Sequence, residues 1–233
     1  MALPKIDLPI MEIELPSTGK KVKYRPFTVK EEKILLVGQS SEDPAQEILA
    51  AKQVVNNCLL ETDISTLAMF DLEYILLILR ARSVNNIIEF NIKDSDTGEE
   101  VTLNLDIDNV SLTRPEGHER DVVINDTYRL ALKYPTIDEY VKMAQMDETD
   151  PLTNYLMLCT CLDYVASEDE VHYFKDYNQE QIDEFMDDLS GEVIHGIQKF
   201  FETMPRLRHE MPYTNKNGDK KTFVIEGMRS FFT

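Results

Sequence analysis

The chain has 233 residues, of which 42% are hydrophobic and 29% charged, a balance that predicts a folded globular protein rather than a disordered one. Its 43 acidic and 24 basic residues give a net charge of −19, which disfavours binding to nucleic acid and to anionic membranes. Residues 67–79 are too short for a membrane span, and the first ten residues lack the apolar region of a signal peptide. We therefore expect a cytoplasmic protein.

The first predicted elements are a β-hairpin and a helix that follows it directly. Residues 11–15 and 21–27 are two extended runs joined by a short turn that contains Gly19. Thr28 and Glu31 then have the spacing of a capping box, in which the threonine oxygen accepts an amide hydrogen bond and the glutamate reaches back. A helix is expected to begin there.

Two further helices and a second hairpin complete the first half. An Asp-Pro pair ending at Pro44 predicts a helix to about residue 60, since proline at the first helical position gives up a donor that would be unpaired. Residues 65–82 are apolar on most sides, as is typical of a central buried helix. Residues 87–93 and 101–106 flank a turn with glycine and predict a hairpin.

The second half repeats this order. A hairpin is expected over residues 121–133, and Pro135 matches Pro26 where strand passes into helix. The remaining predicted elements are helices at residues 152–165, 179–189 and 192–201 and a last hairpin at residues 209–223, whose Gly218 matches Gly98. The agreement in order and turn chemistry indicates internal duplication, with chance similarity between two halves as the alternative.

These elements predict an α+β fold of two similar halves, each with β-hairpins flanking a small helical cluster. The first half is expected to span residues 1–115 and the second residues 116–233. The acidic stretch near residues 167–176 is interpreted as an insertion, either a loop or a short strand. It accounts for the growth of the offset between matched positions, from 109 at Pro26 and Pro135 to 120 at Gly98 and Gly218.

The sequence contains none of the common signatures of nucleotide, phosphate or hydrolase chemistry. Residues 94–98 resemble the start of a calcium loop, but later ligands are missing, so a solvated hairpin turn is expected. Three cysteines argue against a disulfide framework, and Cys159 and Cys161 are expected, like Cys58, to be buried thiols rather than metal ligands. We assign no catalytic residue, metal ligand or cofactor; His195 is the one histidine to examine in a structure.

Four segments carry a resemblance to a known family. They are LPSTGKKVKYRPFTVKEEKILL at residues 15–36, FDLEYILLILRARSV at residues 70–84, Tyr134-Pro135-Thr136 before a predicted helix, and IEGMRSFF at residues 225–232. Together they resemble the baseplate hub assembly proteins of T-even-type contractile-tailed bacteriophages. The resemblance implies a protein without catalysis that acts by protein–protein contact, in the host cytoplasm during assembly and, if retained, in the tail baseplate of the virion.

The resemblance also implies partners and contact residues. The partners would be other baseplate hub or tail proteins, with no nucleic acid, membrane or small-molecule substrate. The candidate contact residues are Arg25 and Phe27 at the first strand-to-helix corner, Arg80 and Arg82 at the end of the central helix, and Phe231 and Phe232. Capping by the arginines and packing of the Phe pair are the structural alternatives.

Two other functions are weighed against a role in hub assembly. One is a tail assembly chaperone that shields the apolar helices of a tape-measure protein. The other is an enzyme with an unrecognised site, built for instance from scattered carboxylates.

Overall fold

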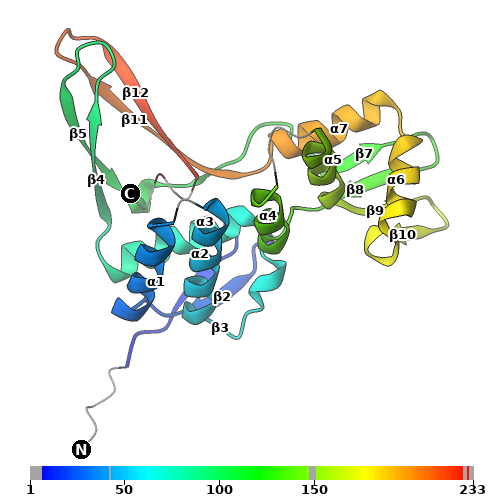
Figure 1. The fold of residues 1–233 in the computed structure, drawn as a ribbon, viewed down its shortest axis with the longest axis horizontal. Coiled ribbons are helices and arrows are strands. Elements are labelled where there is room, and N and C mark those ends of the chain that lie inside the picture. The colour runs from blue at the N-terminus through cyan, green and yellow to red at the C-terminus, as the bar shows by residue number, and fades with distance from the viewer. Residues whose placement is uncertain (1–6, 42, 147–150, 228–229, 231–233) are drawn as a thin grey trace, which may run out of the picture. The chain divides into compact units, whose positions relative to one another are not determined.

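The computed structural model describes residues 7–41, 43–146, 151–227 and 230. The chain forms two compact units: unit 1 comprises residues 1–113 and 206–233, and unit 2 comprises residues 114–205. Each unit combines helices with small antiparallel sheets (Figure 1), which confirms the predicted α+β class.

The two units differ from the predicted halves in the placement of the last hairpin. Arg206 and Leu207 pair with Thr113 and Leu112, so the chain returns to unit 1 directly after unit 2. Unit 2 is thus inserted between two paired strands of unit 1. The derivation of the two halves from one duplicated segment stays a prediction.

Unit 1 begins with the predicted hairpin and helices. Its elements are β1 (Met11–Glu14), β2 (Lys21–Tyr24), α1 (Val29–Gln39), α2 (Pro44–Cys58), β3 (Leu59–Leu60), η1 (Ile64–Thr66), α3 (Met69–Ser83), β4 (Ile87–Lys93), β5 (Glu100–Asp106), η2 (Ile107–Asn109), β6 (Leu112–Thr113), β11 (Arg206–Thr214) and β12 (Lys220–Glu226). The capping box of Thr28 and Glu31 and the helix start at Pro44 are both confirmed. The second helix is shorter than predicted, because Leu59 and Leu60 leave it to pair with β2.

Helix α3 is the central buried helix that the sequence predicts, but it begins at Met69 rather than Ser65, because Ile64–Thr66 form the separate short helix η1. Leu72, Ile75 and Leu76 are almost completely buried, consistent with a helix that is apolar on most sides. Asp71 in its first turn is also buried, and its carboxylate accepts a hydrogen bond of 2.9 Å from the backbone amide of Ser17. This contact ties the turn between β1 and β2 to the helix.

The hairpins β4–β5 and β11–β12 lie side by side in unit 1 (Figure 1) and pack through a shared apolar cluster with α3. The cluster includes Phe90 and Leu105 from one hairpin and Ile225 from the other. Asp94 lies in the turn of the first hairpin, where a solvated turn was expected, yet it is buried. It accepts a hydrogen bond of 2.9 Å from Tyr213 Oη of the second hairpin.

Unit 2 is a four-stranded antiparallel sheet, in the order β10-β9-β8-β7, with helices. Its elements are β7 (Asp121–Val123), β8 (Arg129–Leu132), α4 (Ile137–Ala144), α5 (Pro151–Thr160), β9 (Leu162–Ala166), β10 (Val171–Tyr173), η3 (Phe174–Asp176), α6 (Gln179–Asp187) and α7 (Gly191–Glu202). The predicted helix over residues 152–165 is wrong beyond Thr160, because Leu162–Ala166 form a strand between β8 and β10. The acidic stretch forms the turn after β9, β10 and η3.

The core of unit 2 is built from its own residues. Leu130, Leu132, Ile197 and Phe200 are completely or almost completely buried in one cluster between the sheet and the helices. His118 packs against this cluster, with its ring stacked on Phe200 at 5.0 Å between centroids. Its ring nitrogens contact the hydroxyls of Thr203 and Tyr134, each at 2.9 Å.

Candidate partner-contact site

The strand-to-helix corner after β2 places Arg25 beside Glu31. The Arg25 guanidinium lies 3.0 Å from the Glu31 carboxylate and donates a hydrogen bond of 2.9 Å to the carbonyl of Pro26. About a quarter of the Arg25 side chain, 26%, is exposed, whereas that of Glu31 is 2% exposed. The part of Arg25 that faces solvent is therefore available to a partner while its head group fixes the corner.

Phe27 and the end of α3 lie next to this corner. The Phe27 ring is buried, and the Phe27 amide donates a hydrogen bond of 2.9 Å to Ser83 Oγ in the last turn of α3. Arg82 is exposed and pairs with Asp108 at 3.2 Å. Arg80 is half-buried, and burial lowers the pKa of its guanidinium while the charge of Glu32 in α1 opposes this shift.

The structure therefore brings four of the six predicted contact residues into one region of unit 1. These four are Arg25, Phe27, Arg80 and Arg82. Phe231 and Phe232 lie outside the described residues. The roles of all six in partner contact stay predictions.

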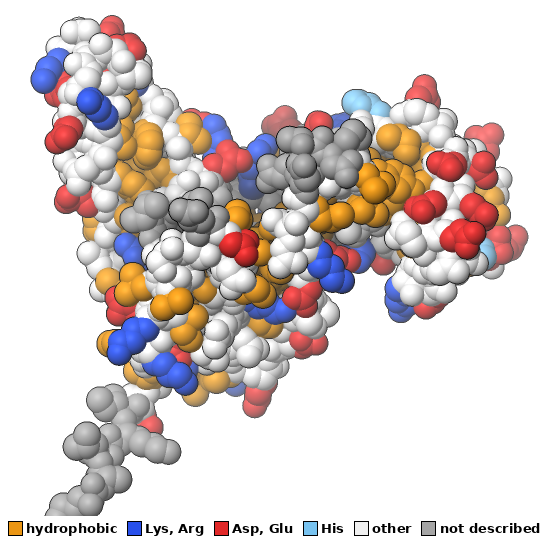
Figure 2. Space-filling view, viewed as in Figure 1, with side chains coloured by type: hydrophobic (Ala, Val, Ile, Leu, Met, Phe, Trp, Pro, Cys, Tyr) orange, Lys and Arg blue, Asp and Glu red, His pale blue; other side chains and the backbone are white. Residues whose placement is uncertain are grey.

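A groove of about 600 Å³ lies between α1 and α2 in the same unit. Gly38 and Leu49 line it, together with Val37, whose side chain is 71% exposed. Val29 and Leu36 are also exposed on α1, and Figure 2 shows apolar and basic side chains near one another around this helix. This surface is not among the sites predicted from the sequence, although the spacing of 29, 36 and 37 places the three side chains on one face of a helix.

Unit 2 contains a second corner with the same hydrogen bonds. Lys133 Nζ lies 2.8 Å from Glu139, which also accepts a hydrogen bond of 2.6 Å from the Thr136 amide in a capping box. The Lys133 amide donates to the carbonyl of Cys161, as the Arg25 amide donates to that of Cys58 in unit 1. The corner is therefore a recurrent way of joining a strand to a helix in this chain.

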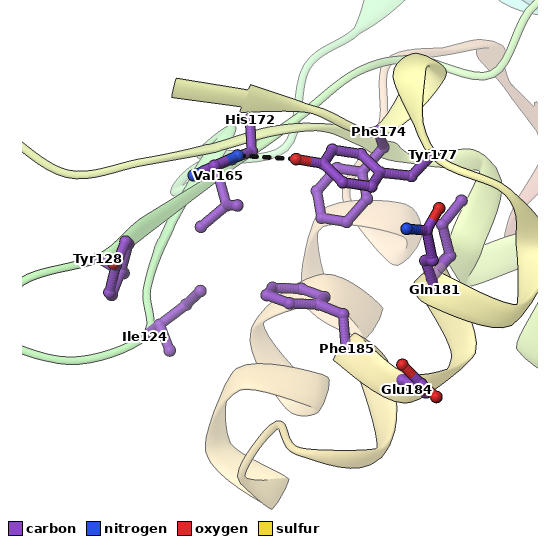
Figure 3. A pocket seen from close by; sticks show the side chains of 10 residues that line it. Ile124, Tyr128, Val165, His172, Phe174, Tyr177, Gln181, Glu184 and Phe185 are labelled. Atoms are coloured by element: carbon purple, nitrogen blue, oxygen red, sulfur yellow. Dashed lines mark hydrogen bonds between the residues drawn. The ribbon is translucent and has the colours of Figure 1, made fainter. Parts of the chain in front are cut away.

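A pocket of about 400 Å³ opens on the surface of unit 2 (Figure 3). Its apolar lining includes Val165, Phe174 and Phe185, and the two phenylalanine rings meet edge to face at 5.2 Å. The pocket could not be predicted from the sequence, because its walls come from the turn after β7, from the strands β9 and β10, and from α6. No local pattern links these segments.

A chain of hydrogen bonds runs along the rim of this pocket. Tyr128 Oη donates to Glu170 at 2.9 Å, Glu170 lies 3.2 Å from His172 Nε2, and His172 Nδ1 lies 2.7 Å from Tyr177 Oη. The hydrogen bonds from Tyr128 and His172 lower the pKa of Glu170. The rim therefore holds a negative charge beside an apolar floor.

The acidic charge of the chain is concentrated in unit 2. Residues 114–205 hold 21 Asp and Glu but seven Lys and Arg, whereas the rest of the chain holds 22 and 17. Figure 2 shows acidic side chains gathered around α6. Unit 2 therefore has a net charge of −14, against −5 for the rest of the chain, a balance that favours contact with positively charged groups.

Cys58 and Cys161 are buried as expected, and burial raises the pKa of Cys58 to about 11, whereas Cys159 is half-buried. His195 is exposed on α7. Among the described residues, no group of three or more His, Cys, Asp or Glu side chains is placed to hold a metal ion.

Among the helices that the structure describes, none is both long and apolar enough to cross a membrane. No curated protein and no solved structure shows a significant match to the chain. Residues 8–233 match the family described as "T4 bacteriophage base plate protein", and the chain therefore belongs to this family of phage baseplate proteins.

Proposed function

We propose that this baseplate protein acts in assembly of the baseplate hub, through contacts with other hub or tail proteins and without catalysis. The observation that carries the proposal is the family match over residues 8–233, which covers both units. The α1–α2 groove and the unit 2 pocket support it, because each offers an apolar surface for a partner. Assembly would take place in the host cytoplasm.

Quantitative mass spectrometry of purified phage particles tests whether the protein stays in the virion. Its amount is measured against the tail-tube protein, both in mature particles and in the infected-cell lysate. A fixed small copy number in particles identifies a structural subunit of the baseplate. Presence in the lysate with absence from particles identifies an assembly factor that leaves.

A phage that lacks the gene tests the proposal itself. We expect its lysates to accumulate tail precursors without complete baseplates, and a plasmid copy of the gene to restore them. Normal baseplates in the absence of the gene would contradict the proposed function.

A second candidate function is a chaperone for the tape-measure protein. The exposed side chains of Val29, Leu36 and Val37 favour it, because an apolar face on α1 can pack against an apolar helix. Parallel pull-downs with a tape-measure fragment and with hub proteins separate the two functions. Retention of the tape-measure fragment alone would replace the hub proposal with the chaperone.

A further inference from the structure

We infer that the unit 2 pocket binds a large apolar side chain carried by a positively charged segment of another tail protein. This inference rests on the proposed function and specifies the chemistry of the partner. It assigns the aromatic floor of the pocket to the apolar side chain, and the carboxylates of its rim to the Lys and Arg residues of the same segment.

The floor has the size and composition of an anchor site. Phe174 and Val165 are buried in the core of unit 2, while Ile182 and Phe185 pack on that core and are only partly buried. The volume of about 400 Å³ is in the range of pockets that enclose small ligands and single anchoring side chains. A leucine, methionine or phenylalanine in this pocket would bury apolar surface that is now open to water.

The walls of the pocket carry side chains that can form hydrogen bonds with the main chain of such a segment. The Gln181 side-chain oxygen accepts a hydrogen bond of 3.1 Å from the Asn178 amide, and its Nε2 faces the pocket (Figure 3). Tyr177 Oη also lines the pocket and is held 2.7 Å from His172 Nδ1. An extended segment beside Gln181 can accept a hydrogen bond from its Nε2 while a side chain of the segment fills the floor.

The charge around the pocket selects a basic segment. Glu184 lines the pocket, and the Glu170 carboxylate lies behind two lining residues, bonded to Tyr128 and to His172. These carboxylates belong to a unit with 21 acidic and seven basic residues. The net negative charge of unit 2 therefore attracts a basic segment at long range, and the carboxylates at the pocket attract it at close range. The same field repels nucleic acid, anionic lipid and acidic protein segments. A second copy of unit 2 is repelled for the same reason.

Site-specific photo-crosslinking in infected cells identifies what occupies the pocket. A photoreactive amino acid replaces Ile124, which lines the pocket from the turn after β7, and a control chain carries it at Gln198, an exposed residue of α7 that does not line the pocket. We expect the probe at position 124 to crosslink one tail protein, through a peptide with excess Lys and Arg and a large apolar residue. A crosslinked peptide that is acidic, that lacks a large apolar residue or that comes from a second copy of this chain would overturn the inference.

A pair of charge reversals tests the rim. Glu184→Lys reverses a carboxylate at the pocket, and Asp187→Lys makes the same change at the end of the same helix, away from the lining. Both side chains are exposed, and thermal unfolding of each variant checks that unit 2 still folds. We expect Glu184→Lys to lower the crosslinking yield from the probe at position 124 about tenfold and Asp187→Lys to change it less than about twofold. Equal yields from the two variants would overturn the inference.

Complementation separates this inference from the proposed function. If the phage without the gene assembles normally, the proposed function fails, and the pocket inference, which rests on it, fails with it. If that phage fails to assemble and Glu184→Lys restores it as fully as the wild-type chain does, only the pocket inference fails. We expect restoration by Asp187→Lys and a reduced yield with Glu184→Lys.

Discussion

Glu31 is a buried carboxylate that holds together the passage from β2 to α1. Burial alone would raise its pKa, but hydrogen bonds from Arg25 and from the hydroxyl and amide of Thr28 outweigh burial and lower the pKa to about 2. The ionised form is therefore the one that the fold stabilises. Glu139 occupies the same position relative to Lys133 and Thr136 in unit 2.

We predict that Glu31→Gln lowers the free energy of unfolding near neutral pH. Because the folded pKa of about 2 lies below the ordinary value of 4.5, the ionised carboxylate contributes on the order of 3 kcal/mol above pH 4.5. This contribution falls as the pH drops from 4.5 towards 2, so wild type and variant should converge in acid. Urea unfolding of both proteins across this range measures the convergence. Glu12→Gln, an exposed change on β1, is the control.

A difference between wild type and Glu31→Gln that stays constant down to about pH 3 would contradict the prediction. Such a result would mean that Glu31 acts through its shape and hydrogen bonds rather than through its charge.

The two corners also show what residue patterns can and cannot predict. The sequence predicts the capping box of Thr28 and Glu31, because this motif depends on local spacing. The match of Pro26 with Pro135 is off by one residue, since the capping threonine of unit 2 is Thr136. Hydrogen bonds fix the position of the threonine at each corner, whereas the proline makes no capping bond. The correct alignment of the two corners therefore pairs Thr28 with Thr136.

At the scale of elements, the sequence wrongly predicts two short apolar strands as parts of helices. Leu59–Leu60 and Leu162–Ala166 each follow a helix directly and are apolar enough to extend it. Periodicity cannot separate a buried strand from a buried helix turn over so few residues. Pairing with β2 and with β8 decides the outcome, and that pairing is not encoded locally.

The close packing of α1 on α2 depends on Gly38. A Cβ atom at this position would lie 2.5 Å from the Cβ of Ala50, so one helix must move to accept it. We predict that Gly38→Ala costs about 1–3 kcal/mol of unfolding free energy through overpacking. Gly191→Ala in the first turn of α7 is the matched control, because a Cβ there meets no atom within 4 Å.

Chemical denaturation of both glycine variants measures this difference. The control should change the unfolding free energy by less than about 1 kcal/mol, with the sign favouring alanine in a helix. Equal stability of Gly38→Ala and wild type would show that the helix pair adjusts without cost.

Asp94 joins the two long hairpins of unit 1 at their turns. Its carboxylate accepts hydrogen bonds from the Thr97 amide and hydroxyl and from Tyr213 Oη, and Lys221 Nζ lies 3.4 Å away. We predict that Asp94→Ala speeds amide hydrogen exchange in the turns of both hairpins, because each loses a bond to the same group. Glu100→Gln, an exposed change on β5, should leave exchange in the β11–β12 turn unchanged.

At the scale of the whole molecule, the two cores are made from different parts of the chain. The core of unit 2 draws all its residues from 114–205. That of unit 1 combines α3 and β4–β5 with Leu207, Met211 and Ile225, which follow unit 2 in the sequence. The sequence predicts each hairpin but not this return, because long-range pairing of β11 with β6 leaves no local signal.

The insertion of unit 2 leads to a prediction about fragments. Residues 114–205 alone should unfold cooperatively, because their core is complete. Residues 1–113 alone should not, because the apolar faces of β4, β5 and α3 would lose their cover from β11 and β12. A chain in which a short glycine-serine linker joins Thr113 to Arg206 should fold again, since these two residues are already paired. Thermal unfolding followed by circular dichroism, together with amide hydrogen exchange, measures the folding of these three chains. Cooperative unfolding of residues 1–113 alone would show that unit 1 folds without the β11–β12 hairpin.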